Sequence, residues 1–395
     1  MTTAHVSPTA NLNPVAAGLT VAVLALNLRP AVTSMGVLLT RIDTAEGLSP
    51  PLAATLVALP TWCFAVGGWT AWRLRARFGI RAVVSSALGV LAVSLIVRTL
   101  PGDATIVAGT TAACLAIAVL GALLPVIVST ATPGSAACYT ACLGTGSAVG
   151  ALLTPTGVAW QLGLGCWALL AAVGLVVWQG SSRHLATPAG AALAARVSPQ
   201  TLIPRGTIAT LTVHFGLLSG VTFLLMGRLP TILRTAGLTQ AEAGYHFATV
   251  MVLGVPASLV VPYLARRVPH APLAVGFAGS SITGVTGLMI SPLSVTWLWT
   301  GLLGIGIGAL ALALVDLGRR THSDPDTTAA LSSVVQGLGY TLAGVLALGV
   351  GLLQIATGTW TWPLFALVVA LVGQALTGTT IGDVRAAPTS PEVSR

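Results

Sequence analysis

An arginine stands inside an otherwise apolar stretch near the N-terminus, LALNLRPAVTSMG (24–36). A guanidinium at the centre of a membrane-spanning helix costs roughly 2.5–3.5 kcal/mol on insertion scales, so a partner must offset that cost. Arg29 and Thr33 share one stripe of a regular helix, whereas Asn27 points to nearly the opposite side. We predict that Arg29 binds an anion in a cavity and count Asn27 and Thr33 among the substrate-binding residues. The alternative is a structural arginine bound by backbone carbonyls of a broken neighbouring helix.

A second polar group lies in LSSVVQGLGYTLAG (331–344). Ser332, Gln336 and Tyr340 follow one another at four-residue spacing, so a helix places them on one face. Tyr139 is expected at a comparable depth in the first half of the chain. We predict that Gln336, Tyr340 and Tyr139 orient a substrate. Hydrogen bonds between helices of the bundle are the open alternative for all three.

Two further arginines lie at the predicted outer ends of spans. Arg98 is expected to extend its guanidinium to the lipid headgroups, which requires no substrate. Arg228 shares a helix face with His214 and is a candidate for gating the outer mouth.

Proton coupling, if present, needs a buried titratable group. Glu242 and Asp316 fall near predicted helix ends, so no mid-span acid is evident. His214 and His246 remain the proton-coupling candidates, and a hydrogen-bonded structural histidine is the alternative for each.

No pattern predicts a metal, a cofactor or catalysis. The five cysteines all fall in predicted spans, without metal-ligand spacing or histidine partners, and are expected to be small packing residues. The segments GTGSAVG (144–150) and GLLGIGIG (301–308) lie inside apolar stretches and predict helix-packing surfaces, not phosphate loops.

The elements that position these residues follow from composition. The 395 residues are 55% hydrophobic and 7% charged, and the mean hydropathy of +0.91 predicts an all-α, multi-pass membrane protein. Twelve transmembrane helices are expected, at residues 14–40, 51–71, 80–100, 104–128, 136–158, 163–180, 207–228, 243–264, 271–291, 295–317, 327–351 and 361–381.

The net charge of +9 comes from arginine clusters in short loops on one predicted side, which excludes a nucleic-acid-binding face. The positive-inside rule then places both termini in the cytoplasm. We expect the protein in the cell (inner) membrane. The first dozen residues lack the features of a cleaved signal peptide, so the first span is expected to remain as an anchor.

The longest polar interruption divides the spans into six and six. We expect a tail (1–13), an N-terminal bundle (14–180), a cytoplasmic linker (181–206), a C-terminal bundle (207–381) and a second tail (382–395). Gly47-Leu48-Ser49 recurs as Gly237-Leu238-Thr239, which indicates a parallel repeat of the kind that secondary transporters contain. We expect a monomer.

Several segments carry a resemblance to a known family. LNLRPAVTSMGVLLTRI, RLRARFGIR, HFGLLSGVTFLLMGRLPTILRTAGLTQAEAG and ALSSVVQGLGYTLAGVLALGVGLLQIATGTW look like the cyanate and 2-nitroimidazole transporter branch of the major facilitator superfamily. The resemblance implies alternating access of two six-helix bundles and a small, often anionic or nitro-bearing solute. RLRARFGIR is a degenerate form of a superfamily loop, because it lacks the usual aspartate.

Three other functions are alternatives to the transport of a solute that binds Arg29. Drug or metabolite efflux would use a roomy, mainly apolar cavity. A membrane-embedded enzyme would need clustered acids or histidines, and the nine acids are scattered. A receptor would usually carry an output domain, and the last fourteen or so residues are too short for one.

Overall fold

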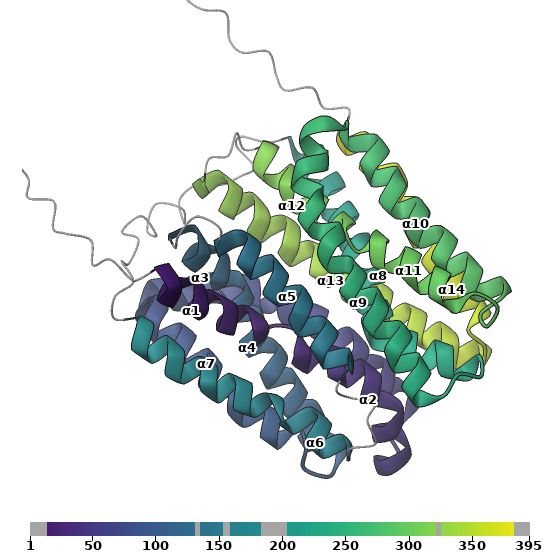
Figure 1. Ribbon diagram of the computed structural model, residues 1–395, viewed down its shortest axis with the longest axis horizontal. Helices are drawn as coiled ribbons and strands as arrows, with labels where there is room; N and C mark the ends of the chain where they lie inside the picture. Colours follow the sequence, from purple (N-terminus) through teal and green to yellow (C-terminus); the bar gives the residue numbers. More distant parts are fainter. Residues whose placement is uncertain (1–13, 131–134, 153–158, 183–203, 321–324, 383–395) are drawn as a thin grey trace, which may run out of the picture.

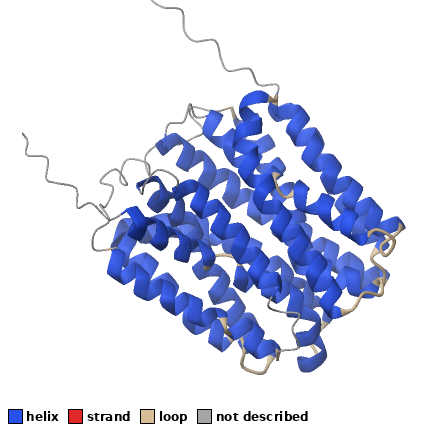
Figure 2. Cartoon of the chain, in the orientation of Figure 1, coloured by secondary structure: helices blue, strands red, loops and turns tan. Residues whose placement is uncertain are grey.

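The computed structural model describes residues 14–130, 135–152, 159–182, 204–320 and 325–382, and these are almost entirely helical (Figures 1 and 2). The described residues contain no strand. Ten of their helical segments are long and apolar enough to cross a membrane. Hydropathy thus predicted the element type correctly, because only helices or closed barrels satisfy all backbone polar groups in lipid.

Fourteen helices make up the described chain. The N-terminal helices are α1 (Pro14–Leu26), α2 (Pro30–Glu46), α3 (Pro50–Val97), α4 (Asp103–Thr130), α5 (Ser135–Leu152), α6 (Trp160–Gly165) and α7 (Trp167–Ser181). The C-terminal helices are α8 (Arg205–Thr235), α9 (Gln240–Arg267), α10 (His270–Ile290), α11 (Thr296–Gly306), α12 (Ala309–Arg320), α13 (Pro325–Thr357) and α14 (Thr361–Gly382).

The first predicted span is two helices, α1 and α2, separated by a turn at residues 27–29. Pro30 causes the break, because proline has no N–H to continue the hydrogen-bond ladder and suits the first turn of a new helix. The second helix runs on to Glu46, beyond the predicted end at residue 40.

The second and third predicted spans form one element, α3, which contains a non-helical residue at Gly79 (φ 77°, ψ 155°). A positive φ is strained for residues with a Cβ, so glycine permits the chain to reverse there. The apolar stretch described in α5 is short, at Ala141–Leu152. These two elements account for the difference between ten segments and the twelve predicted spans.

The N-terminal and C-terminal helices lie side by side in Figure 1, and contacts between several pairs of helices join them. The helix α3 packs along α13, α5 along α9, and α2 against α8. Most of the predicted linker lies outside the described residues, and so do both tails apart from residue 382. The predicted bundle boundaries in these segments therefore lie outside them as well.

Close approach of α3 and α13 depends on small residues. A Cβ on Gly344 of α13 would overlap the Trp62 indole of α3, and one on Gly351 would lie 2.9 Å from the Cβ of Ala54. Small residues are the usual means by which membrane helices pack, since lipid supplies no hydrophobic driving force between them.

Candidate functional site

The break between α1 and α2 positions Arg29 as the N-cap residue of α2, with φ −120° and ψ −40°. Its side chain extends to α8 among the C-terminal helices. The guanidinium carbon lies 5.7 Å from the centre of the Phe223 ring, and Nη1 lies 3.8 Å from the sulfur of Met226. Arg29 therefore bridges the N-terminal and the C-terminal helices.

Arg29 has no oxygen partner within the described part of the chain. Its one hydrogen bond there goes to the Met226 thioether, and the one ion pair found there joins two other residues. A thioether is a weak acceptor and a phenylalanine ring provides only a cation–π contact. The alternative of a structural arginine held by backbone carbonyls is therefore not what the described residues show. Guanidinium donors remain available to a ligand.

Two tyrosine hydroxyls interact electrostatically with this guanidinium, Tyr139 from α5 and Tyr340 from α13. Neither hydroxyl forms a hydrogen bond with any described residue. The structure thus brings together three of the predicted site residues, one cation and two phenols, from three different helices.

The Tyr340 ring belongs to an aromatic cluster that the sequence analysis missed. Its centre lies 5.4 Å from that of Phe64 on α3, 5.1 Å from that of Phe215 and 6.1 Å from that of Phe223, both on α8. Phe215 and Phe223 are two helical turns apart, a spacing that places them on one face of α8 and was readable in the sequence. Together with Arg29, this cluster offers planar apolar faces next to a cation.

Gln336, also predicted here, uses its amide on its own helix, since Nε2 donates to Ser332 Oγ one turn away. It lies one turn from Tyr340, and no contact with Arg29 is found in the described chain. Its role in binding stays a prediction.

Asn27 and Thr33 lie apart from the guanidinium. The Asn27 amide donates to the carbonyl oxygens of Val23 (2.8 Å) and of Leu170 on α7 (3.3 Å). Thr33 is fully buried and donates to the carbonyls of Arg29 and Pro30. Both side chains are thus occupied within the N-terminal helices, and neither is placed with Arg29 and the tyrosines.

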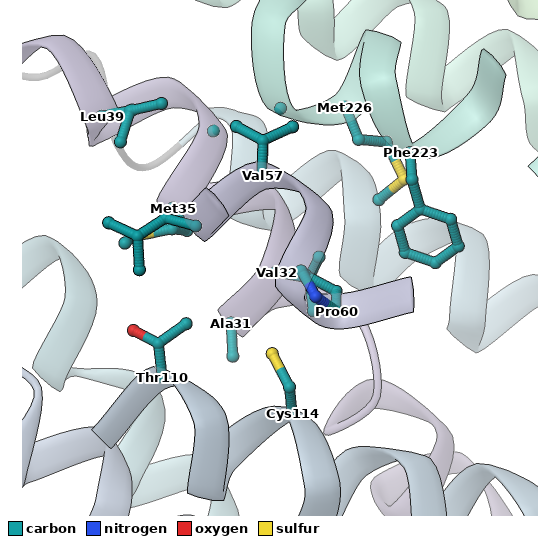
Figure 3. A pocket seen from close by; sticks show the side chains of 13 residues that line it. Ala31, Val32, Met35, Leu39, Val57, Pro60, Thr110, Cys114, Phe223 and Met226 are labelled. Atoms are coloured by element: carbon teal, nitrogen blue, oxygen red, sulfur yellow. The ribbon is translucent and has the colours of Figure 1, made fainter. Parts of the chain in front are cut away.

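A small cavity adjoins the contacts of Arg29 (Figure 3). Phe223 and Met226 of α8 form one part of its wall, and Thr110 and Cys114 of α4 form another. Its volume is about 20 Å³, enough for roughly one water molecule. The remaining wall comes mostly from apolar side chains of α2 and α3. A solute can occupy this cavity only if the surrounding helices separate.

Arg98 corrects a prediction. It does not extend to headgroups but is 1% exposed, and its guanidinium donates to the carbonyl oxygens of Ala31 (2.9 Å) and Leu164 (3.0 Å). Leu164 lies at the end of α6, where carbonyls lack partners within the helix. Arg98 thus connects α3, α2 and α6, and it is a structural arginine.

Arg228 is buried as well, at 9% exposure, and its Nε has no hydrogen-bond partner in the described chain. It interacts electrostatically with Asp43 at the end of α2 and lies beside Gly351 of α13. Its predicted gating role is untested by these contacts. They do show that it is held between N-terminal and C-terminal helices.

The histidines separate into two places. His246 on α9 is buried against Trp297, with ring centres 4.0 Å apart, and its Nδ1 lies 3.4 Å from Thr300 Oγ1. His214 on α8 is buried near His270 and Asp316. Asp316 is 5% exposed and lies within ion-pair distance of His270. Asp316 lies near a helix end, as predicted, but it is buried, because neighbouring helices cover that position here.

No family model matches the chain. A 2-nitroimidazole transporter of Escherichia coli (strain K12) is 30% identical over 375 residues, covering 91% of this chain and 93% of that protein. The cyanate transport protein CynX of the same organism is 29% identical over 374 residues, covering 89% and 94%. The uncharacterized transporter YycB of Bacillus subtilis (strain 168) is 29% identical over 372 residues, covering 91% of each.

Solved structures show the same fold at low sequence identity. A nucleoside transporter, NupG, superposes with a TM-score of 0.74 at 10% identity, covering 92% of this chain and 99% of that one. A D-xylose-proton symporter superposes with a TM-score of 0.71 at 13% identity, covering 94% and 97%.

The fold and these relatives define the class: the protein is a multi-pass membrane transporter with the major facilitator fold, not an enzyme. Within that superfamily, the chain belongs to the family of the cyanate and 2-nitroimidazole transporters. Its partners are accordingly a small-molecule substrate and the lipid bilayer.

Proposed function

We propose that the protein is a secondary transporter of a small anionic or polar solute and that Arg29 is the main contact of that solute. The observation that supports this most is the guanidinium of Arg29, which lies between the N-terminal and C-terminal helices with no oxygen partner among the described residues. A cation placed there at a cost in insertion free energy is explained by a ligand that neutralises it.

The surroundings of Arg29 suit the solutes named for two relatives. Arginine presents a planar fork of N–H donors that binds the oxygens of a nitro or carboxyl-like group or the end of a linear anion. The hydroxyls of Tyr139 and Tyr340 add hydrogen-bonding groups, and Phe223 adds a face for a planar ring. Cyanate and 2-nitroimidazole are therefore the first solutes to test.

We further propose that the arginine-rich end of the bundle faces the cytoplasm. At this end lie Arg73, Arg77, Arg205, Arg267 and Arg319. The positive-inside rule then places both termini in the cytoplasm and the chain in the cell membrane, as a monomer that rocks between inward-open and outward-open states.

Uptake of labelled cyanate and 2-nitroimidazole by proteoliposomes tests the proposal. Arg29→Gln removes the charge and is expected to abolish carrier-dependent uptake while the protein stays folded. Arg73→Gln is the matched control, because the exposed guanidinium of Arg73 donates, within the described chain, only to the Trp69 carbonyl of its own helix, at 3.1 Å. Transport by Arg29→Gln at the wild-type rate would contradict the proposal.

Efflux of drugs or metabolites is the second candidate function. The apolar cavity wall and the aromatic cluster around Tyr340 favour it. Expressing cells would then resist a panel of apolar compounds, and the resistance would persist in Arg29→Gln. Anion uptake without such resistance would exclude efflux.

A further inference from the structure

A buried histidine–carboxylate group lies among the C-terminal helices, apart from Arg29. His270 is the first residue of α10, and its Nδ1 lies 3.0 Å from Oδ2 of Asp316 on α12. The two side chains are only 8% and 6% exposed. Among the carboxylates whose burial the structure describes, Asp316 is the one that is buried.

His214 on α8 adds a second imidazole with a defined tautomer. Its Nδ1 lies 3.1 Å from the Gln374 carbonyl oxygen of α14 and 3.0 Å from Thr377 Oγ1. A carbonyl only accepts, and Thr377 already donates its hydroxyl proton to its own helix. Nδ1 must therefore carry the proton, and in the neutral ring Nε2 is a bare acceptor.

Several polar atoms of this group have no hydrogen-bond partner in the described chain: both ring nitrogens of His270, Asp316 Oδ2 and Gln374 Oε1. The contact between His270 Nδ1 and Asp316 Oδ2 has the distance of an ion pair but not the alignment of a hydrogen bond. Polar atoms that are buried without partners are rare, and each requires an explanation such as a water or an exchanging proton. Here they belong to side chains of α10, α12 and α14, and α10 packs against both of the other helices.

The charges facing this place come from α8, α10 and α12. His214 faces it from α8 and His270 from α10, while α12 supplies Asp316 and, one turn further on, Arg320, which interacts electrostatically with Asp316. The helix α14 contributes the neutral Gln374 and Thr377. The α9 side contributes the Ala265 carbonyl, which Arg319 of α12 binds.

We propose that His214, His270 and Asp316 form a proton-binding site that couples solute movement to a proton, which rests on the transport function proposed above. A hydronium ion from water at the arginine-rich end breaks one O–H bond, and the proton forms an N–H bond at the bare Nε2 of an imidazole. The imidazolium then faces the Asp316 carboxylate. Release reverses these steps and returns the proton to water.

The placement links protonation to the solute site through α8. His214 and Phe223 lie nine residues apart on this helix, a rise of about 14 Å at 1.5 Å per residue. Protonation removes the net negative charge of the histidine–aspartate pair in a low-dielectric place, which changes how strongly α8, α10 and α12 attract one another. The helix α8, which carries the contacts of Arg29, therefore also responds to protonation of His214, His270 and Asp316.

Proton binding is tested first without any solute. Infrared difference spectra of the reconstituted protein between pH 5 and pH 9 are expected to show imidazole bands of the bound proton and a shift of the band of the Asp316 carboxylate beside it. Asp316→Asn and His270→Gln are expected to lose these bands. Glu242→Gln, which removes an exposed carboxylate at the start of α9, is the control and keeps them. Bands that persist unchanged in both variants would overturn the proposal.

Coupling is tested with labelled 2-nitroimidazole in proteoliposomes, with uptake by protein-free vesicles subtracted. Asp316→Asn and His214→Gln are expected to lose accumulation driven by a pH gradient while solute exchange at equal pH continues. Asp316→Glu keeps the carboxylate and is expected to restore the gradient response. Gradient-driven accumulation by Asp316→Asn at the wild-type level would overturn the proposal.

The two tests separate this proposal from the proposed function. Absence of uptake and exchange by the wild-type protein, with both cyanate and 2-nitroimidazole, counts against the proposed solutes. The infrared titration still decides whether His270 and Asp316 bind a proton.

Discussion

At the scale of single residues, two arginines in apolar helices have opposite surroundings. Arg98 donates to two carbonyl oxygens and is fully enclosed, whereas Arg29 meets a thioether and an aromatic ring. The first arrangement binds both terminal nitrogens of the guanidinium to protein oxygens, and only Nε has no partner in the described chain. The second leaves its donors to a ligand, so the same side-chain type is structural in one place and available for binding in the other.

This contrast predicts that the two arginines differ in what their loss affects. Arg98→Leu removes two charge-assisted hydrogen bonds and is expected to lower the free energy of unfolding by about 2 kcal/mol. Thermal unfolding in detergent measures the change. Arg29→Gln is expected to leave the unfolding midpoint near that of the wild type. A large loss of stability in Arg29→Gln with none in Arg98→Leu would contradict the assignment.

The sequence predicted Arg29 and the tyrosines as site residues but not the partners of Arg98 or Asp316. The cost of a mid-span cation is local and readable, so Arg29 stood out. The Arg98 partners are backbone carbonyls of α2 and α6, which no side-chain pattern marks. Asp316 resembled an exposed helix-end residue because the covering His270 comes from another helix.

At the scale of helices, α13 owes its contact with α3 to residues without side chains. Gly344 lies against the indole of Trp62, whereas Gly349, on the same helix, has open space where a Cβ would be. Hydropathy predicted α13 as a span. The sequence did not indicate that α13 packs against α3, because close packing depends on complementary shapes of segments that are distant in the sequence. Similarly, hydropathy predicted one span at residues 14–40, and only the structure shows two separate helices there.

Valine at these two glycines is expected to act differently. Gly344→Val forces α3 and α13 apart and is expected to destabilise the protein by about 1–3 kcal/mol, the usual range for overpacking. Gly349→Val is the matched control, since the same side chain meets no neighbour. Thermal unfolding of both variants provides the measurement. Equal stability of the two would show that α3 and α13 do not pack as described.

At the scale of the whole molecule, the end opposite the arginine-rich end holds the N-terminal and C-terminal helices together. Thr40 Oγ1 of α2 lies 3.4 Å from Thr231 Oγ1 of α8, and Gln240 Nε2 of α9 donates to the Val37 carbonyl at 2.9 Å. A Cβ on Gly36 of α2 would overlap the Met226 carbonyl of α8, so the backbones of these two helices are in close contact. Alternating access requires these contacts to break once in each cycle.

A disulfide across this contact is expected to stop transport. With the five native cysteines replaced by serine, Thr40→Cys and Thr231→Cys together bring two thiols to neighbouring positions of α2 and α8. Oxidation is expected to abolish solute exchange, and reduction is expected to restore it. Each single variant is the control. Full exchange by the oxidised pair would show that this end of the molecule does not need to open.

The most direct measurement is equilibrium binding of labelled cyanate and 2-nitroimidazole to the purified protein. A guanidinium that donates to the solute contributes about 1.4 kcal/mol or more, so Arg29→Gln should weaken binding about tenfold or more. Arg29→Lys, which keeps the charge but loses the planar fork, should fall between the two. Equal affinity of wild type and Arg29→Gln for both solutes would contradict the account.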